Sequence, residues 1–163
     1  PKRDWSSDVC SSDLYDTTNQ TATSITESYA VSFSNVQFNE DISRSNNSRF
    51  YVSHTFIYSI TFSIQFINTD NNVVHDAYAW LAVDGTNINN TNTYVSIPGA
   101  HSGVDGSAVM TVNLFNLINS GSYFEIRWAT NSTNVSIQTI SAASSPTRPA
   151  SPGVILTAFR INN

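Results

Sequence analysis

The sequence predicts an all-β fold, an antiparallel jelly-roll sandwich of eight to ten strands, and three observations lead to this prediction. Stretches in which apolar and polar residues alternate recur along the chain, as they do in half-buried strands. Clusters of Gly, Pro, Asn, Asp and Ser separate these stretches, as turns separate strands. Charged residues make up 12% of the 163 residues and aromatic residues another 12%, so charged helix formers are scarce and strand formers are common.

The first fourteen residues, PKRDWSSDVCSSDL, differ in composition from the rest of the chain. They contain its only lysine, Lys2, and its only cysteine, Cys10. The order WSSDVCSSDL resembles a translated sequencing adapter, so 1–14 are expected to be an artefactual tail outside the fold. Residues 15–27 are polar and lack periodicity, which predicts a linker or an edge segment. A single jelly-roll domain is then expected over 28–163, a length that suffices for one hydrophobic core.

The expected strands follow from the alternation, taken in chain order. The clearest covers 57–67, where apolar residues alternate strictly with small or uncharged ones. Shorter strands are expected at 29–33, 36–38, 49–52, 77–83, 86–88, 94–97, 123–129 and 135–140, and longer ones at 108–118 and 154–161. Asp84-Gly85 predicts a tight turn. A polar turn cluster is expected at 39–48, and an exposed loop rich in Pro and Ser at 141–153.

Several strands have a second face that is neutral or apolar instead of charged. On 57–67 the apolar face is opposed by Ser, Thr and Gln, whereas a strand that faces water normally presents Lys or Glu. The strand at 154–161 is apolar on both faces, which is unusual for an antiparallel strand with water on one side. We therefore expect an interface between three copies of the chain. Its residues would be Ser59, Thr61, Ser63, Gln65, Val109, Thr111, Asn113, Phe115 and Phe159. The alternative is a monomer whose own loops cover this sheet.

Charge and motif content restrict the functions that are open to the chain. The formal net charge is −5, so no basic surface is expected for a nucleic-acid backbone. No apolar run predicts insertion into a membrane. The three histidines, His54, His75 and His101, lack the spacing of metal ligands. No nucleophile motif, phosphate-binding glycine loop or close pair of carboxylates suggests catalysis. We therefore expect neither an enzyme nor a resident cofactor or metal.

Two groups of residues are candidates for ligand binding. Tyr78 and Trp80 alternate with Ala79, Leu81 and Val83, so if the smaller residues face the core, the two aromatic rings face outward. Exposed rings beside Asn and Asp suit a carbohydrate, because they combine apolar ring faces with directional hydrogen bonds. A neighbouring subunit or a long loop covering the two rings is the alternative.

The second group is a cluster of loop residues that could form if two loops meet at one end of the sandwich. Its members would be His75, Asp76, His101 and Asp105. Loop histidines bonded to nearby backbone are the simpler alternative, and a site made by three copies of His101 on a common axis also stays open. Farther along the chain, Phe124, Ile126 and Trp128 are expected in the core, and Glu125 and Arg127 are expected to form a modest surface pair.

The order of these elements resembles the trimeric jelly rolls of the tumour-necrosis-factor and complement-globular-head superfamily. The resemblance is carried by SRFYVSHTFIYSITFSIQF, AYAWLAVDGT, GSAVMTVNLFNLINSGSYFEIRW and the terminal VILTAFRI. It spans 29–161. The glycine that usually precedes the long strand is replaced here by Phe56, which departs from the superfamily at that turn. The resemblance implies a TNF-like sandwich that assembles as a homotrimer.

Three segments resemble, more narrowly, a family of predicted bacteriophage proteins from environmental samples. They are HDAYAWLAVDGTNI, SIPGAHSGVDGSAV and SPTRPASPGVILT. This resemblance implies a virion protein, a tail-fibre tip or a capsid-associated trimer, whose partners are further copies of itself and other virion proteins, and it supplies no receptor. The rings of Tyr78 and Trp80 add a cell-surface glycan as a candidate partner. The alternatives are a secreted, extracellular carbohydrate-binding or adhesion domain of a bacterium and an assembly module without a ligand.

Overall fold

Two β-sheets pack face to face in the computed structural model, which describes residues 11–161. Within that range every regular element is a strand, and all strand pairs are antiparallel. The first sheet consists of β1 (Ser11–Asp16), β2 (Gln20–Thr21), β4 (Asn35–Glu40), β7 (Phe56–Asn68), β11 (Gly106–Ile118), β13 (Val135–Ile137) and β16 (Val154–Arg160). The second consists of β3 (Tyr29–Ala30), β5 (Ile42–Ser45), β6 (Arg49–Val52), β8 (His75–Val83), β9 (Thr86–Asn87), β10 (Thr93–Ile97) and β12 (Tyr123–Thr130).

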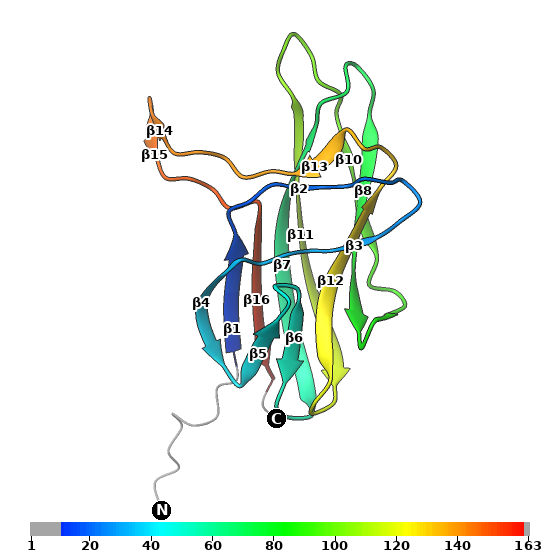
Figure 1. Ribbon diagram of the computed structural model, residues 1–163, viewed down its shortest axis with the longest axis vertical. Helices are drawn as coiled ribbons and strands as arrows, with labels where there is room; N and C mark the ends of the chain where they lie inside the picture. Colours follow the sequence, from blue (N-terminus) through cyan, green and yellow to red (C-terminus); the bar gives the residue numbers. More distant parts are fainter. Residues whose placement is uncertain (1–10, 162–163) are drawn as a thin grey trace, which may run out of the picture.

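The order of the strands is that of a jelly roll. In the first sheet β11, β7, β16, β1 and β4 lie side by side, and in the second β10, β8, β12, β6 and β5 do so. The last strand, β16, therefore lies between β1 and β7, and the chain passes repeatedly from one sheet to the other (Figure 1). Such alternation between two sheets produces the two Greek keys of a jelly roll. The predicted all-β antiparallel sandwich is thereby confirmed.

The core lies between the two sheets and is rich in aromatic rings. The apolar face of β7 is fully buried, as the alternation predicted. From the second sheet β12 contributes Phe124, Ile126 and Trp128, which are also buried. The rings of Phe66 and Trp128 lie 5.9 Å apart and connect the two layers. Buried aromatic side chains of this size supply much of the apolar area that stabilises a sandwich.

The N-terminal segment departs from the expected domain boundaries. Ser11–Asp16 form β1, which pairs with β16 on one side and with β4 on the other. Its side chains alternate, and Leu14 belongs to the core. The expected tail 1–14 therefore does not hold for residues 11–14, and residues 1–10 lie outside the described range. The expected linker or edge segment 15–27 completes β1, which pairs with β16, and contains β2, which pairs with β13 at an end of the sheet.

Two other segments also differ from expectation. The predicted turn cluster 39–48 contains the end of β4 and the whole of β5, joined at Asp41 with a φ of 60°. Asn46 and Asn47, with φ values of 51° and 57°, make the next turn, because Asn tolerates this left-handed region better than most residues. The exposed loop 141–153 holds a small hairpin, β14 (Ala143–Ser144) and β15 (Thr147–Arg148), which projects from the body (Figure 1).

Candidate functional site

The outer face of the first sheet brings together all nine residues that were expected at an interface. Here and below, this outer face means the side of β1, β7, β11 and β16 that points away from the core. In one row across the strands Asn113, Thr61 and Thr157 are neighbours. In the next row Phe115, Ser59 and Phe159 are neighbours. Since the nine residues lie on adjacent strands and share one face, they form a continuous surface.

The polar side chains of this outer face bond to one another or to nearby backbone. Asn113 Nδ2 donates to Thr61 Oγ1 at 2.6 Å and to Ser59 Oγ at 3.0 Å. Thr111 Oγ1 donates to Ser63 Oγ at 3.1 Å. Polar groups that already have partners lose little when water is removed from them, whereas unpaired ones are costly to bury. This outer face is thus polar in composition but suited to being covered.

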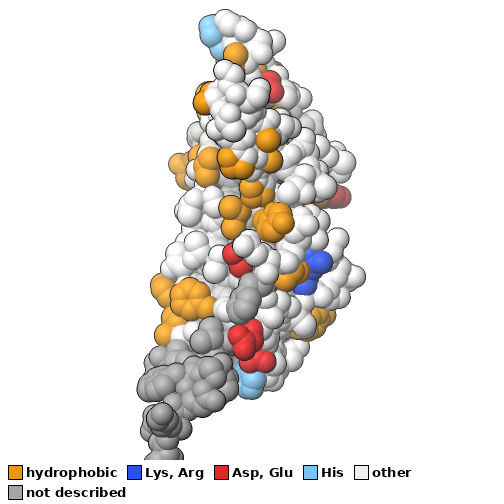
Figure 2. Space-filling view, turned by 90° about the vertical axis from the view of Figure 1, so that its left-hand side faces the viewer, with side chains coloured by type: hydrophobic (Ala, Val, Ile, Leu, Met, Phe, Trp, Pro, Cys, Tyr) orange, Lys and Arg blue, Asp and Glu red, His pale blue; other side chains and the backbone are white. Residues whose placement is uncertain are grey.

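Large apolar side chains stand among these polar groups. Val109, Phe115 and Leu117 of β11 are 60%, 64% and 62% exposed, and Ile155 and Phe159 of β16 are each 44% exposed. Among the described residues of β1, β7, β11 and β16, Asp13 is the one charged residue at an outward position. Figure 2 looks onto the left-hand side of Figure 1, where β4 and β1 lie, and it shows hydrophobic side chains spread along the molecule, with a group of acidic side chains in its lower part. Large exposed apolar side chains that lie together on one face are typical of a protein–protein contact.

Two further residues of β11 and β7 belong to this surface but were not among the nine expected ones. Leu117 has the same parity as Phe115 and lies opposite Ile57, which is 46% exposed. Continuing the alternation to the ends of both strands would have found these two residues.

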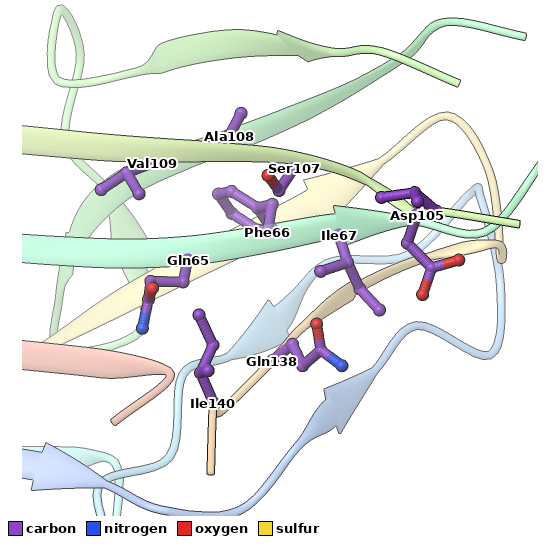
Figure 3. A pocket seen from close by; sticks show the side chains of 10 residues that line it. Gln65, Phe66, Ile67, Asp105, Ser107, Ala108, Val109, Gln138 and Ile140 are labelled. Carbon is purple, nitrogen blue, oxygen red and sulfur yellow. The ribbon is translucent and has the colours of Figure 1, made fainter. Parts of the chain in front are cut away.

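A hollow of about 470 Å³ lies at one end of the same outer face. Figure 3 shows Gln65, Gln138 and Ile140 close together beside β7, with Asp105 beyond them. Gln138 N donates to Gln65 O at 3.0 Å, so the chain that follows β13 forms one wall. The lining mixes amides with aliphatic side chains and holds no pair of groups arranged for acid–base chemistry.

The two predicted aromatic residues lie on the outer face of the second sheet, and a third one, Tyr94, lies beside them. Ala79 and Leu81 are fully buried while Tyr78 and Trp80 are partly exposed, as the alternation predicted. Tyr94 of β10 lies directly opposite Tyr78, their ring centres are 6.0 Å apart, and Tyr94 is 64% exposed. Trp80 Nε1 donates to Asn87 Oδ1 at 2.7 Å. Tyr94 was missed because its place beside Tyr78 depends on strand pairing.

A buried carboxylate occupies the middle of this second outer face. Glu125 is only 4% exposed, and its two oxygens lie 3.2 Å from Arg127 Nη1 and 3.8 Å from Arg49 Nε. Arg127 also donates through Nη2 to Ser28 O and Oγ, each at 2.8 Å, and Arg49 stacks 4.7 Å above the ring of Tyr123. The expected modest surface pair is therefore a nearly buried carboxylate between two arginines.

The two loops expected to form a histidine cluster do meet at one end of the sandwich. Ala100 N donates to Asp70 O at 2.8 Å, and Asn72 N donates to Ala100 O at 2.9 Å. Each histidine nevertheless has a partner of its own. His75 Nε2 donates to Asp70 Oδ2 at 2.9 Å, and His101 Nδ1 lies 3.1 Å from Asn72 Oδ1. The hydrogen bond from His75 lowers the pKa of the Asp70 carboxyl below its ordinary value.

The two carboxylates expected in that cluster have separate surroundings. Asp76 Oδ1 accepts from Ser96 Oγ at 2.6 Å, beside Tyr78 on β8. Asp105 is exposed and lines the hollow on the other sheet. Across residues 11–161 no group of three or more His, Cys, Asp and Glu side chains is arranged to hold a metal ion.

Comparison with known proteins gives no assignment. Neither the protein-family models nor the curated proteins compared with the chain provide a match. In the part of the chain that the structure describes, no helix is long and apolar enough to cross a membrane. The candidate sites are therefore the two outer faces of the sandwich, defined by their own residues.

Proposed function

We propose that this chain is a non-enzymatic structural domain of a bacteriophage particle, a TNF-like jelly roll that assembles as a homotrimer and decorates the virion or contacts the host surface. One observation carries the proposal: the outer face of the first sheet is nearly free of charge, and it exposes large apolar side chains among polar ones that are already hydrogen-bonded. Its partner is a second and third copy of the same chain. Closed symmetry about one axis buries the same surface on every copy.

The hydrogen bonds between polar side chains on this face favour a partner chain, rather than water, as its neighbour. Ser59, Thr61 and Asn113 satisfy one another, so an apolar partner would leave none of these three side chains without a hydrogen bond. Phe115 and Phe159 flank Ser59 in the same row and supply the large side chains on which interface energy usually concentrates. The scarcity of charge reduces the desolvation cost of assembly.

The order of the strands and three sequence segments support the more specific parts of the proposal. The strand order β11, β7, β16, β1, β4 is compatible with the TNF-like resemblance, and the virion assignment comes from the three segments that resemble bacteriophage proteins. Three identical sites on one axis would reinforce one another when the particle meets a cell. A secreted adhesion or carbohydrate-binding domain is the second candidate, and the exposed pair Tyr78 and Tyr94 favours it.

Sedimentation and light scattering of the purified chain test the assembly. We expect a species of three times the 17.9 kDa protomer mass, and we expect Phe115→Glu to convert it to folded monomer because three carboxylates would meet near the axis. Tyr94→Glu is the matched control, since Tyr94 is as exposed as Phe115 but lies on the other sheet. A monomer for the unmodified chain, verified as folded by circular dichroism, would remove the basis of the proposal.

Genomic position separates the two candidates. A gene surrounded by capsid, portal and tail genes supports the virion domain. A gene preceded in frame by a secretion signal and surrounded by bacterial metabolic genes supports the secreted adhesin instead.

A further inference from the structure

We infer that the outer face of the second sheet binds a neutral oligosaccharide along a row formed by Tyr94, Tyr78 and Trp80. This inference deepens the proposed function, and rests on it insofar as trimer formation through the first sheet would leave the second sheet facing outward. The polar side chains that border the rings are Asp76, Ser96 and Asn87.

The backbone of β8 arranges the row. Asp76, Tyr78 and Trp80 occupy successive outward positions, which lie about 7 Å apart along a strand. Tyr94 widens the row, because it sits opposite Tyr78 with its ring tilted by 34° to that of Tyr78. The result is a shallow, open aromatic surface, on which the apolar faces of a sugar ring can lie against aromatic faces.

Directional polar groups border the rings on both sides and are held in place by other bonds. Asn87 Oδ1 accepts from Trp80 Nε1, which fixes the orientation of the indole and directs the amide nitrogen of Asn87 away from it. At the other end, Asp76 is fixed by the bond from Ser96, and Asn131 Oδ1 accepts from the backbone N of Asp76 at 2.9 Å. Fixed donors and acceptors beside rings suit a polyhydroxylated ligand, because little side-chain entropy is lost on binding.

The charges around the row favour a neutral sugar over an acidic one. Arg127 lies opposite Trp80 and is the cation nearest to the row in the strand register, but Glu125 and Ser28 already hold its guanidinium. The acidic side chain at the other end is Asp76, which disfavours a carboxylated sugar.

Binding is tested with the full chain and a panel of oligosaccharides of glucose, mannose and galactose, beside matched ones that carry a uronic or sialic acid. Tryptophan fluorescence and an immobilised array report binding. We expect neutral members to bind, and Tyr94→Ala to weaken that binding about tenfold, because the removed ring is largely exposed and contributes little to the core. Tyr51→Ala, on the same sheet but away from the row, is the matched control and is expected to bind normally.

The assembly and the sugar site fail in different ways. In the Phe115→Glu background the affinity of each single site is expected to be unchanged, and only the multivalent gain on a dense array is lost. Absence of binding to every neutral member, stronger binding of the acidic members, or equal binding by Tyr94→Ala would each overturn the inference, whatever the oligomeric state. Trp80→Ala is also expected to weaken binding. Where it fails to fold, Trp80→Phe keeps an aromatic ring at this position while it removes the bond to Asn87 and part of the ring surface.

Discussion

Replacing Leu14 by Ala tests whether the N-terminal strand belongs to the fold. Leu14 is 1% exposed and lies opposite Leu156 of β16 and Val36 of β4. Removing a buried leucine side chain in this way costs 2–5 kcal/mol in other proteins, so we expect a loss of about 3 kcal/mol in the free energy of unfolding. For a domain of this size the melting temperature should fall by about 9 °C.

Urea unfolding followed by circular dichroism measures the loss, and Ile25→Ala provides the control. Ile25 is 58% exposed, so its truncation should change the free energy of unfolding by less than about 0.5 kcal/mol. A Leu14→Ala variant as stable as the unmodified chain would refute the placement of β1. It would then favour the interpretation of residues 1–14 as a tail outside the domain.

Two further outcomes concern the loops at the end of the sandwich. Asn68 is fully buried, and its amide donates to the carbonyls of Val73, Ile97 and Pro98. In urea titrations Asn68→Ala should therefore lower the free energy of unfolding by about 3 kcal/mol. Asn89→Ala, at an exposed position, is the control and should leave the free energy of unfolding unchanged. The pKa of Asp70 is lowered in the folded chain by its bond to His75. This bond therefore stabilises the folded chain fully at pH values above the ordinary carboxyl pKa of about 3.9. The stabilisation is lost as the pH falls through the lowered pKa of the folded chain. Asp70→Asn should therefore lower the free energy of unfolding near neutral pH, and the two chains should become equally stable in strong acid. A difference in the free energy of unfolding that stays constant with pH would contradict this role of the bond between Asp70 and His75.

The alternation of side chains proved informative wherever a strand is apolar on its inner face. The strand 57–67 was predicted almost to its ends, and the five residues of its apolar face are all buried. The expected faces of 123–129 and 154–161 agree with the structure in the same way. A period of two is a local property that follows from backbone geometry, so the sequence alone can show it.

The first strand shows where this local signal is too weak. In SSDLYD only Leu14 is an apolar residue on the buried side, and its inward neighbours Ser12 and Asp16 are polar. Asp16 is buried because its carboxylate accepts from Thr18 N and from Ser34 N, 18 positions away in the chain. Partners that distant cannot be found by counting along a sequence.

Strand pairing also determined both candidate surfaces. Tyr94 and Tyr78 become neighbours because β10 pairs with β8. Glu125 gains a second arginine because Arg49 of β6 joins Arg127, which lies on the same strand as Glu125. The alternation of side chains along each strand was enough to select the nine expected interface residues. The hydrogen bonds between their polar side chains, however, depend on the register between β7 and β11. A shift by one residue would have exchanged the inner and outer faces of β11.

By itself, the sequence determined that this chain is all-β, which side chains of its long strands point inward, and that one outer face has almost no charge. The tertiary structure alone decided that the last strand lies between β1 and β7, that β1 belongs to the sheet, and which aromatic rings gather on the opposite face. The reason is physical. Side-chain direction in a strand is fixed by the residue's own backbone, whereas the neighbour across a sheet is fixed by hydrogen bonds between residues far apart in the chain.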